Sequence, residues 1–324
     1  MTSQTEHVTQ QHFLDLESTT PEALEELLDL AVRMRRKPRR YVKLLRGESV
    51  ACYFEKPSTR TRVSFEVAAH RLGALPIMLR PDELQLGRGE PISDTAKVLS
   101  SYCCAIVGRV FDQATLLEMA RHATVPVVNA LSGDHHPCQA LADLLTMRDH
   151  FGQLAGLSVA YVGDTTNVAN SLMQACALAG VKITLSAPLR YTGDPEIVRQ
   201  ADRVASTNGT EVRQVESAEE AVSGADVVYT DSWVSMGRED EQAQRVRAFE
   251  PFRVTRELMA LAQPEAVFMH CLPAHRGEEV TAEVIDGPQS IVFAQAANRL
   301  PTEQAVLWAL VAHRHEDDSE DEDR

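Results

Sequence analysis

The chain has 324 residues, of which 44% are apolar, and its formal net charge at pH 7 is −15. This length is enough for two domains of ordinary size, and no apolar run approaches the 18 residues of a membrane-spanning helix. The acidic balance argues against nucleic acid or an anionic membrane surface as a partner.

The first half of the chain alternates apolar runs with amphipathic segments. A helix with proline at its start is expected over residues 21–36. The strands expected after it are 50–54, 77–79, 105–107 and 125–129. The helices expected between and after these strands begin near residue 58 and cover 95–101, 113–123 and 136–149.

A second series of elements starts after Gly156. Its expected strands are 157–164, 182–187, 211–215, 226–230, 266–270 and 290–293, and its expected helices are 167–179, 195–207 and 302–313. Strands that alternate with helices indicate an α/β fold with mostly parallel sheets flanked by helices. We therefore expect two such domains, residues 1–149 and 150–296, with a helix over about 297–313 that packs back on the first.

The two ends of the chain and its cysteines carry further expectations. Residues 316–324 hold seven acids and one arginine, so 314–324 are expected to form a disordered acidic tail. The polar N-terminus lacks the apolar core of a signal peptide, which favours a cytoplasmic location. The six cysteines form no CxxC pair and are expected to be reduced thiols.

The most informative segment is Ser58-Thr59-Arg60-Thr61-Arg62, between an apolar strand and a helical pattern. The N-terminus of a helix favours an anion, and hydroxyls and a guanidinium add donors. The alternative is a helix N-cap with a structural role alone, but two arginines beside three hydroxyls favour a phosphate site. Because no glycine-rich loop is present, a small phosphorylated metabolite fits better than a nucleoside triphosphate.

Three further segments follow strands or open helices, where ligand sites of α/β sheets lie. They are His136-Pro137-Cys138-Gln139, Asp231 to Gly237, and His270-Cys271-Leu272-Pro273. Taken alone, His136 could be a structural cap residue and Asp231 a turn residue. A zinc site from His136, Cys138, His270 and Cys271 is a weak alternative, because these spacings match no zinc pattern. The turn at Gly163 lacks the G-x-G-x-x-G fingerprint, so a dinucleotide is not supported.

Together these motifs resemble the aspartate/ornithine carbamoyltransferase family, and within it the ornithine branch, from about His12 to Ala312. The resemblance implies a carbamoyl-phosphate-binding domain, an ornithine-binding domain, and transfer of the carbamoyl group to the δ-amine of L-ornithine. The products would be L-citrulline and phosphate, in arginine metabolism and biosynthesis. It also implies a homotrimer without cofactor or metal, in which Gln85 reaches the neighbouring subunit's site.

The resemblance also assigns roles to single residues. Carbamoyl phosphate would be bound by Ser58, Thr59, Arg60, Thr61, Gln85, Arg109, His136, Gln139, Cys271, Leu272 and Arg299. L-Ornithine would be bound by Asn167, Asp231, Ser235 and Met236. The expected catalytic residues are Arg109, His136, Cys271 and Arg299. Family members usually carry acids just before the Asn-Arg pair, so Ala297 is expected to leave Arg299 without that carboxylate neighbour.

Three other functions compete with this one. A sister transcarbamoylase for putrescine or an acylated ornithine would be expected to change Asp231 or the Ser235-Met236 segment, and both are present. A non-catalytic phosphate-binding subunit would be expected to lose Arg109, His136 or Cys271, which are also present. An NAD-linked dehydrogenase would require the missing glycine fingerprint.

Overall fold

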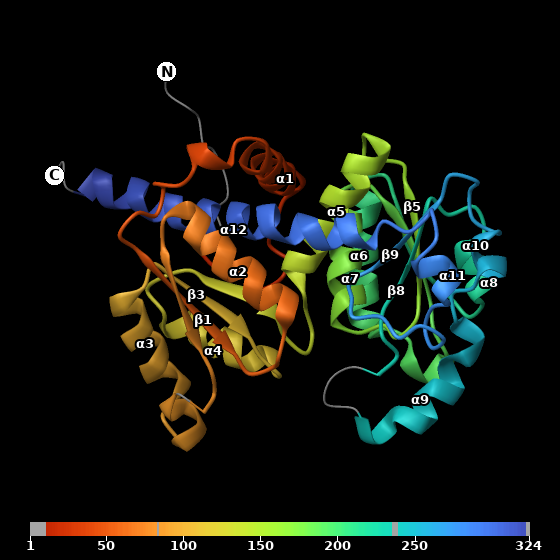
Figure 1. Ribbon diagram of the computed structural model, residues 1–324, viewed down its shortest axis with the longest axis horizontal. Coiled ribbons are helices and arrows are strands. Elements are labelled where there is room, and N and C mark those ends of the chain that lie inside the picture. Colours follow the sequence, from red (N-terminus) through yellow and green to blue (C-terminus); the bar gives the residue numbers. More distant parts are fainter. Residues whose placement is uncertain (1–10, 83, 235–238, 322–324) are drawn as a thin grey trace. The chain divides into compact units, whose positions relative to one another are not determined.

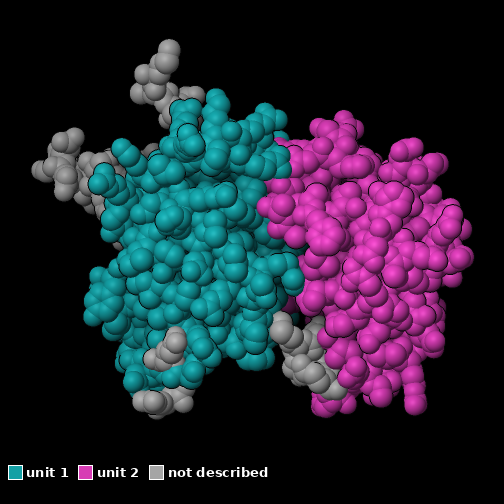
Figure 2. Space-filling view, viewed as in Figure 1, with its two compact units in different colours: residues 1–141, 299–324 teal, residues 142–298 magenta. Residues whose placement is uncertain are grey.

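The structure is a computed structural model that describes residues 11–82, 84–234 and 239–321. The chain divides into two compact units, coloured separately in Figure 2. Unit 1 comprises Met1–Leu141 and Arg299–Arg324, and unit 2 comprises Ala142–Asn298. The division falls inside helix α5 (Pro137–Phe151) and inside helix α12 (Val292–Asp321).

Unit 1 is built on a parallel sheet of four strands in the order β2-β1-β3-β4; its central strands β1 and β3 are labelled in Figure 1. The strands are β1 (Ser49–Phe54), β2 (Leu75–Leu79), β3 (Ala105–Arg109) and β4 (Val127–Leu131). The helices are α1 (Pro21–Arg36), η1 (Pro38–Arg40), α2 (Thr59–Leu72), η2 (Gln85–Arg88), α3 (Ile92–Tyr102) and α4 (Gln113–His122). The apolar side chains of β1 and β3 are at most 8% exposed, as expected for strands covered on both faces.

The strand order of unit 1 reverses between β1 and β3. The chain leaves β1 toward β2 through α2, and it returns through α3 to β3 on the other side of β1. Right-handed crossovers then place α2 on one face and α3 with α4 on the other. Phe54 is the register partner of Arg109, so β1 and β3 end side by side. Such a switch point is where parallel sheets bind ligands.

Unit 2 is built on a parallel sheet of five strands in the order β7-β6-β5-β8-β9. The strands are β5 (Ser158–Val162), β6 (Lys182–Ser186), β7 (Val212–Val215), β8 (Val227–Thr230) and β9 (Val267–His270). The helices are α6 (Asn167–Leu178), η3 (Leu189–Tyr191), α7 (Pro195–Thr207), α8 (Ala218–Val222), η4 (Glu239–Glu241), α9 (Gln242–Phe249), η5 (Glu250–Phe252), α10 (Arg256–Met259) and α11 (Ala282–Ile285). Figure 1 shows α6 and α7 on one face of this sheet and α8, α10 and α11 on the other.

The α/β fold class with two parallel sheets is therefore confirmed. The strand expected at 290–293 is wrong, because only Ser290 forms an isolated bridge, to Phe268, and α12 begins at Val292. That helix also differs from the expected 302–313, since it includes Pro301 and continues to Asp321. The backbone is thus helical over most of the segment expected to be a disordered tail. In the described ranges, no helix is both long and apolar enough to cross a membrane.

Candidate functional site

The chain passes from β1 through a short turn into α2, and side-chain hydrogen bonds fix both ends of that turn. Ser58 is the N-cap of α2: its backbone is extended, and its Oγ accepts a hydrogen bond from the Thr61 amide at 3.2 Å. In the turn, the Glu55 carboxylate accepts from the Phe111 amide at 2.8 Å, which ties the turn to the residues after β3. The capping role weighed from the sequence is therefore real, and it fixes the first turn of α2 at the switch point.

Two buried arginines converge on Thr61. Arg109, the last residue of β3, and Arg299, in α12, donate to Thr61 Oγ1 at 3.4 and 3.3 Å. Arg299 also donates to the Gln139 side-chain oxygen at 2.7 Å. All four side chains are at most 5% exposed. We call Arg60, Thr61, Arg109, His136, Gln139 and Arg299 the arginine cluster.

His136 is the titratable imidazole of the arginine cluster. Burial lowers the pKa of its imidazole well below the usual range, and the positive charges of Arg299, Arg109 and Arg60 lower this pKa further. A neutral ring can donate from one nitrogen without adding a charge to the site. The cluster as a whole presents guanidinium, hydroxyl, amide and imidazole groups, which are the donors that suit a phosphate or a polarised carbonyl oxygen.

Other residues expected in unit 1 lie further out. Thr59 is exposed in the first turn of α2. Arg62, which the sequence motif includes, is also exposed. Gln85 is exposed at the start of η2, and hydrogen bonds join its backbone oxygen to the amides of Gly89 and Glu90.

In unit 2, the expected residues gather where the neighbouring strands β5, β8 and β9 end. Thr230 is the register partner of His270, so Asp231 and Cys271 leave the sheet side by side. Gly163 lies after β5 with φ +144°, and a Cβ there would come 3.2 Å from Thr230 Oγ1. Only glycine combines this backbone conformation with so close an approach. The turn then delivers Asn167 to the first position of α6.

Asp231 is the acidic centre of this second group. Its Oδ1 accepts from the Ser232 amide at 2.7 Å and from the Cys271 thiol at 3.1 Å. Asn167 Oδ1 accepts from the Val168 amide at 2.9 Å. Asp231, Cys271 and Asn167 are partly exposed, so a ligand can reach them. We call these three residues the Asp231 cluster. Ser235 and Met236, also expected to bind ornithine, lie outside the described residues.

His270 is engaged on both ring nitrogens. Nδ1 accepts from the Leu272 amide at 2.8 Å, so Nε2 carries the hydrogen and donates to the Glu279 carboxylate at 3.2 Å. Asp231, His270 and Cys271 bring potential ligand atoms within 4.8 Å of one another, but this imidazole has no nitrogen left for a metal. Leu272, whose amide makes this hydrogen bond, has φ +58°. That left-handed backbone conformation costs free energy in any residue other than glycine.

Arg299 lacks the usual acid at position 297 and pairs with a different one. Arg299 has a carboxylate neighbour, but the carboxylate comes from Glu303, one turn later on α12. Glu303 Oε1 accepts from Arg299 Nη2 at 2.6 Å and from Nε at 3.1 Å, and the Glu303 side chain is fully buried. The i,i+4 spacing of Arg299 and Glu303 is the sequence signal that could have indicated this pair.

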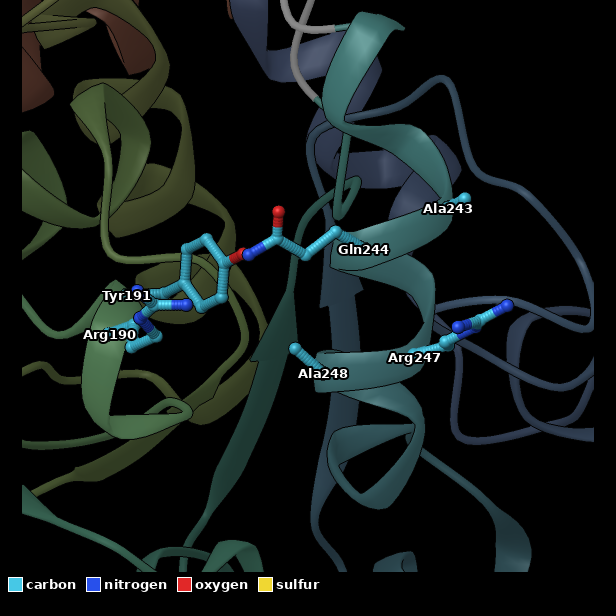
Figure 3. Close-up of a pocket in the computed structure, with 6 residues that line it drawn as sticks. All are labelled: Arg190, Tyr191, Ala243, Gln244, Arg247 and Ala248. Carbon is cyan, nitrogen blue, oxygen red and sulfur yellow. The ribbon is translucent and has the colours of Figure 1, made fainter.

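A second buried pair, also missed from the sequence, supports the turn before Asn167. Arg245 of α9 is fully buried and donates from Nη1 and Nη2 to Asp164 Oδ2 at 3.1 and 3.0 Å. Its guanidinium lies 4.7 Å from the Tyr191 ring centroid. Tyr191 also lines an open cavity of about 580 Å³, in which the side chains of Tyr191 and Gln244 point toward each other (Figure 3). That cavity contains none of the expected site residues.

The fold and the arginine cluster define the class of protein. Unit 1 is a parallel α/β unit whose switch point carries a helix N-terminus and three arginines, as a phosphate-binding domain requires. Two family models match the chain. The carbamoyl-P binding domain of aspartate/ornithine carbamoyltransferase matches residues 11–149, and the Asp/Orn binding domain matches residues 155–310. The chain belongs to the aspartate/ornithine carbamoyltransferase family.

Individual relatives agree with these models over nearly their full lengths. The chain is 52% identical to the ornithine carbamoyltransferase of Acidothermus cellulolyticus over 301 residues, 93% of this chain and 96% of the relative. It is 48% identical to that of Archaeoglobus fulgidus, covering 94% and 99%. Among solved structures, the ornithine carbamoyltransferase of Pyrococcus furiosus is similar with a TM-score of 0.88 and 45% identity, covering 91% of this chain and 95% of the other.

Proposed function

We infer that this chain transfers the carbamoyl group of carbamoyl phosphate to the δ-amine of L-ornithine, forming L-citrulline and phosphate. The observation that carries this function is the convergence of Arg109 and Arg299 on Thr61, at the first turn of α2. The names of the relatives support ornithine as the acceptor, and the family models support a carbamoyl-phosphate unit and an amino-acid unit.

The residue types of the arginine cluster fit the carbamoyl donor. Ser58, Thr59, Arg60 and Thr61 would bind the phosphate, with Arg109, His136, Gln139 and Arg299 at the phosphate or carbonyl end. When the neutral amine attacks the carbamoyl carbon, negative charge develops on the carbonyl oxygen, and donors aimed there lower the barrier. The carbon–oxygen bond to phosphate then breaks, and the leaving phosphate takes the amine proton. No covalent nucleophile is required.

The Asp231 cluster fits the acceptor. Asp231 would pair with the α-ammonium group of ornithine, and Asn167 would bind the α-carboxylate end. The Cys271 thiol is a hydrogen-bond donor to Asp231, so Cys271 would position and desolvate the amine rather than attack. Ser235 and Met236 would complete the acceptor site, and Leu272 would lie between the two substrates.

The assembly and the cellular role belong to the same proposal. We propose a homotrimer in which the exposed Gln85 completes the site of a neighbouring subunit, in a cytoplasmic enzyme of arginine biosynthesis. Sedimentation velocity of the full chain measures the assembly directly, and a monomeric mass would contradict the role of Gln85.

The test of the function is an acceptor comparison. Citrulline formation from carbamoyl phosphate is measured beside parallel reactions with putrescine, acetylornithine and aspartate. We expect ornithine to be preferred, and equal or better turnover of another acceptor would refute the assignment.

Asp231→Asn should raise the KM for ornithine far more than the KM for carbamoyl phosphate. Asp286→Asn, which changes an exposed acid of the same unit, is the matched control and should alter neither constant.

A further inference from the structure

Glu303 contacts the guanidinium of Arg299 along one edge only. Its Oε1 accepts from both Nε and Nη2, while Nη1 donates to Gln139 and Nη2 also donates to Thr61. The carboxylate therefore holds the Nε–Nη2 edge, and the adjacent Nη1–Nη2 edge faces Gln139 and Thr61. Because a guanidinium is planar, fixing one edge fixes the direction of the remaining N–H groups.

This pair lies where a change of charge has a large effect. Glu303 is fully buried, Arg299 is 3% exposed, and water screens neither group strongly. A long arginine side chain has many rotamers, and a misplacement of about 1 Å in a group that contacts the reacting atoms can cost about 100-fold in rate. A carboxylate one helical turn away lies close enough to bind the guanidinium and so restricts those rotamers.

The surroundings of Glu303 also influence its protonation. Burial raises the pKa of Glu303 to about 7, although the positive charge of Arg299 acts in the opposite direction. Charged or titratable groups around this pair include Arg60 and Glu66 of α2, Arg109 of β3, His136 just before α5, Cys138 of α5 and Cys52 of β1. Burial raises the pKa of both thiols and lowers the pKa of His136, so each of these shifts favours the neutral form of its group.

We propose that Glu303 is the positioning residue of Arg299: it orients the guanidinium toward Gln139 and Thr61, and its charge sets how strongly the arginine cluster attracts an anion. The effect that we expect on the rate of citrulline formation rests on the proposed function. The anion-binding consequence depends on the arginine cluster alone. Nothing in the role requires Glu303 to touch a substrate.

Two substitutions separate position from charge. In Glu303→Gln, the amide oxygen can still accept from Nε and Nη2 but carries no charge, whereas Glu303→Ala removes the acceptor. Glu66→Gln is the matched control, because it removes the same charge from an exposed position on α2. The full-length proteins are titrated with sulfate, a dianion that does not itself titrate near neutrality, by calorimetry between pH 6 and 8.

We expect the wild type to bind sulfate more weakly as pH rises, by about fivefold or more, since ionised Glu303 opposes the anion at close range. Glu303→Gln should bind sulfate with nearly the same affinity at both pH values, and Glu66→Gln should behave like the wild type. A wild type whose pH dependence is no greater than that of Glu303→Gln would overturn the charge role. This comparison holds even if Glu303→Ala does not fold.

The kinetic arm uses citrulline formation. Glu303→Ala should lower kcat by about tenfold or more while the KM for carbamoyl phosphate changes much less, and Glu303→Gln should keep kcat within about threefold of the wild type. A kcat for Glu303→Ala within twofold of the wild type would refute the positioning role. If the wild type forms no citrulline at all, the proposed function fails, and the sulfate titrations still decide the role of Glu303.

Discussion

Thr61 has a small side chain but a central place in unit 1. Its hydroxyl oxygen has two lone pairs, and Arg109 and Arg299 donate to that one oxygen. With both lone pairs occupied, the hydroxyl hydrogen remains, and we propose that it donates to bound carbamoyl phosphate. One hydroxyl therefore aligns two guanidinium groups and contributes a donor of its own.

This arrangement predicts the effect of Thr61→Val. Valine has the same shape but can neither accept from the arginines nor donate to the ligand. A hydrogen bond to a charged group is worth about 1.5–3 kcal/mol, so kcat/KM for carbamoyl phosphate should fall by about 10–100-fold. Thr61→Ser keeps the hydroxyl and should recover most of the activity in the same steady-state assay. Equal losses in both variants would show that packing, rather than the hydroxyl, matters at this position.

At the residue scale, the sequence indicates site residues that directly follow strands, but it does not reveal the buried charged residues inside helices. Thr61, Arg109 and Asp231 stand next to apolar runs, and that position alone suggests a ligand site. Glu303 and Arg245 lie in helices, where a charged residue usually faces solvent. Their burial depends on partners at positions 299 and 164, and only the i,i+4 spacing of the first pair is visible in the sequence.

At the element scale, helix α9 supports the turn that precedes Asn167. Arg245 ties α9 to Asp164, and its neighbours Phe249 and Trp233 stack with ring centroids 6.0 Å apart. Trp233 is fully buried and follows Asp231 by two residues. Helix α9 thus contacts two of the three segments that carry the Asp231 cluster, the turn before Asn167 and the residues after Asp231.

Removing the charge of Arg245 should affect unit 2 in two ways. Arg245→Met leaves Asp164 buried without its partner, which costs about 3–5 kcal/mol and should lower Tm by on the order of 10 °C. Because the turn before Asn167 loses its support, the KM for ornithine should rise while sulfate binding stays unchanged. Arg247→Met, on the exposed side of α9, is the control for calorimetry and kinetics. A Tm loss with an unaltered ornithine KM would limit Arg245 to a structural role.

The sequence predicts a helix or strand well where its apolar pattern and its start and stop residues indicate the same bounds. Residues 21–36 combine an N-terminal proline with an apolar stripe, and the helix has these bounds. The short apolar run at Ile291 and Val292 favours a strand over residues 290–293, but α12 starts at Val292. A proline inside a helix removes an amide donor and often ends the helix, yet α12 continues through Pro301.

For the whole molecule, the raised pKa of Glu303 predicts how stability changes with pH. The folded chain keeps a proton, up to about pH 7, that the unfolded chain releases near its ordinary value of 4.5. The stabilisation linked to this proton is present below pH 4.5 and is lost as pH rises through about 7. The Tm of the wild type minus that of Glu303→Gln, measured by calorimetry from pH 5 to 8, should therefore decrease with pH. A constant or increasing difference would contradict the raised pKa.

Unit 1 is discontinuous in the chain, and this has a consequence for synthesis. Thr61 and Arg299 are 238 residues apart, and all of unit 2 is translated between Leu141 and Arg299. On the ribosome, domains generally fold as they emerge, so the sheet of unit 1 must wait for its last helix until unit 2 has been made. A nascent chain that stops before Arg299 contains every strand of both sheets, yet its arginine cluster lacks one arginine and the acid that orients it.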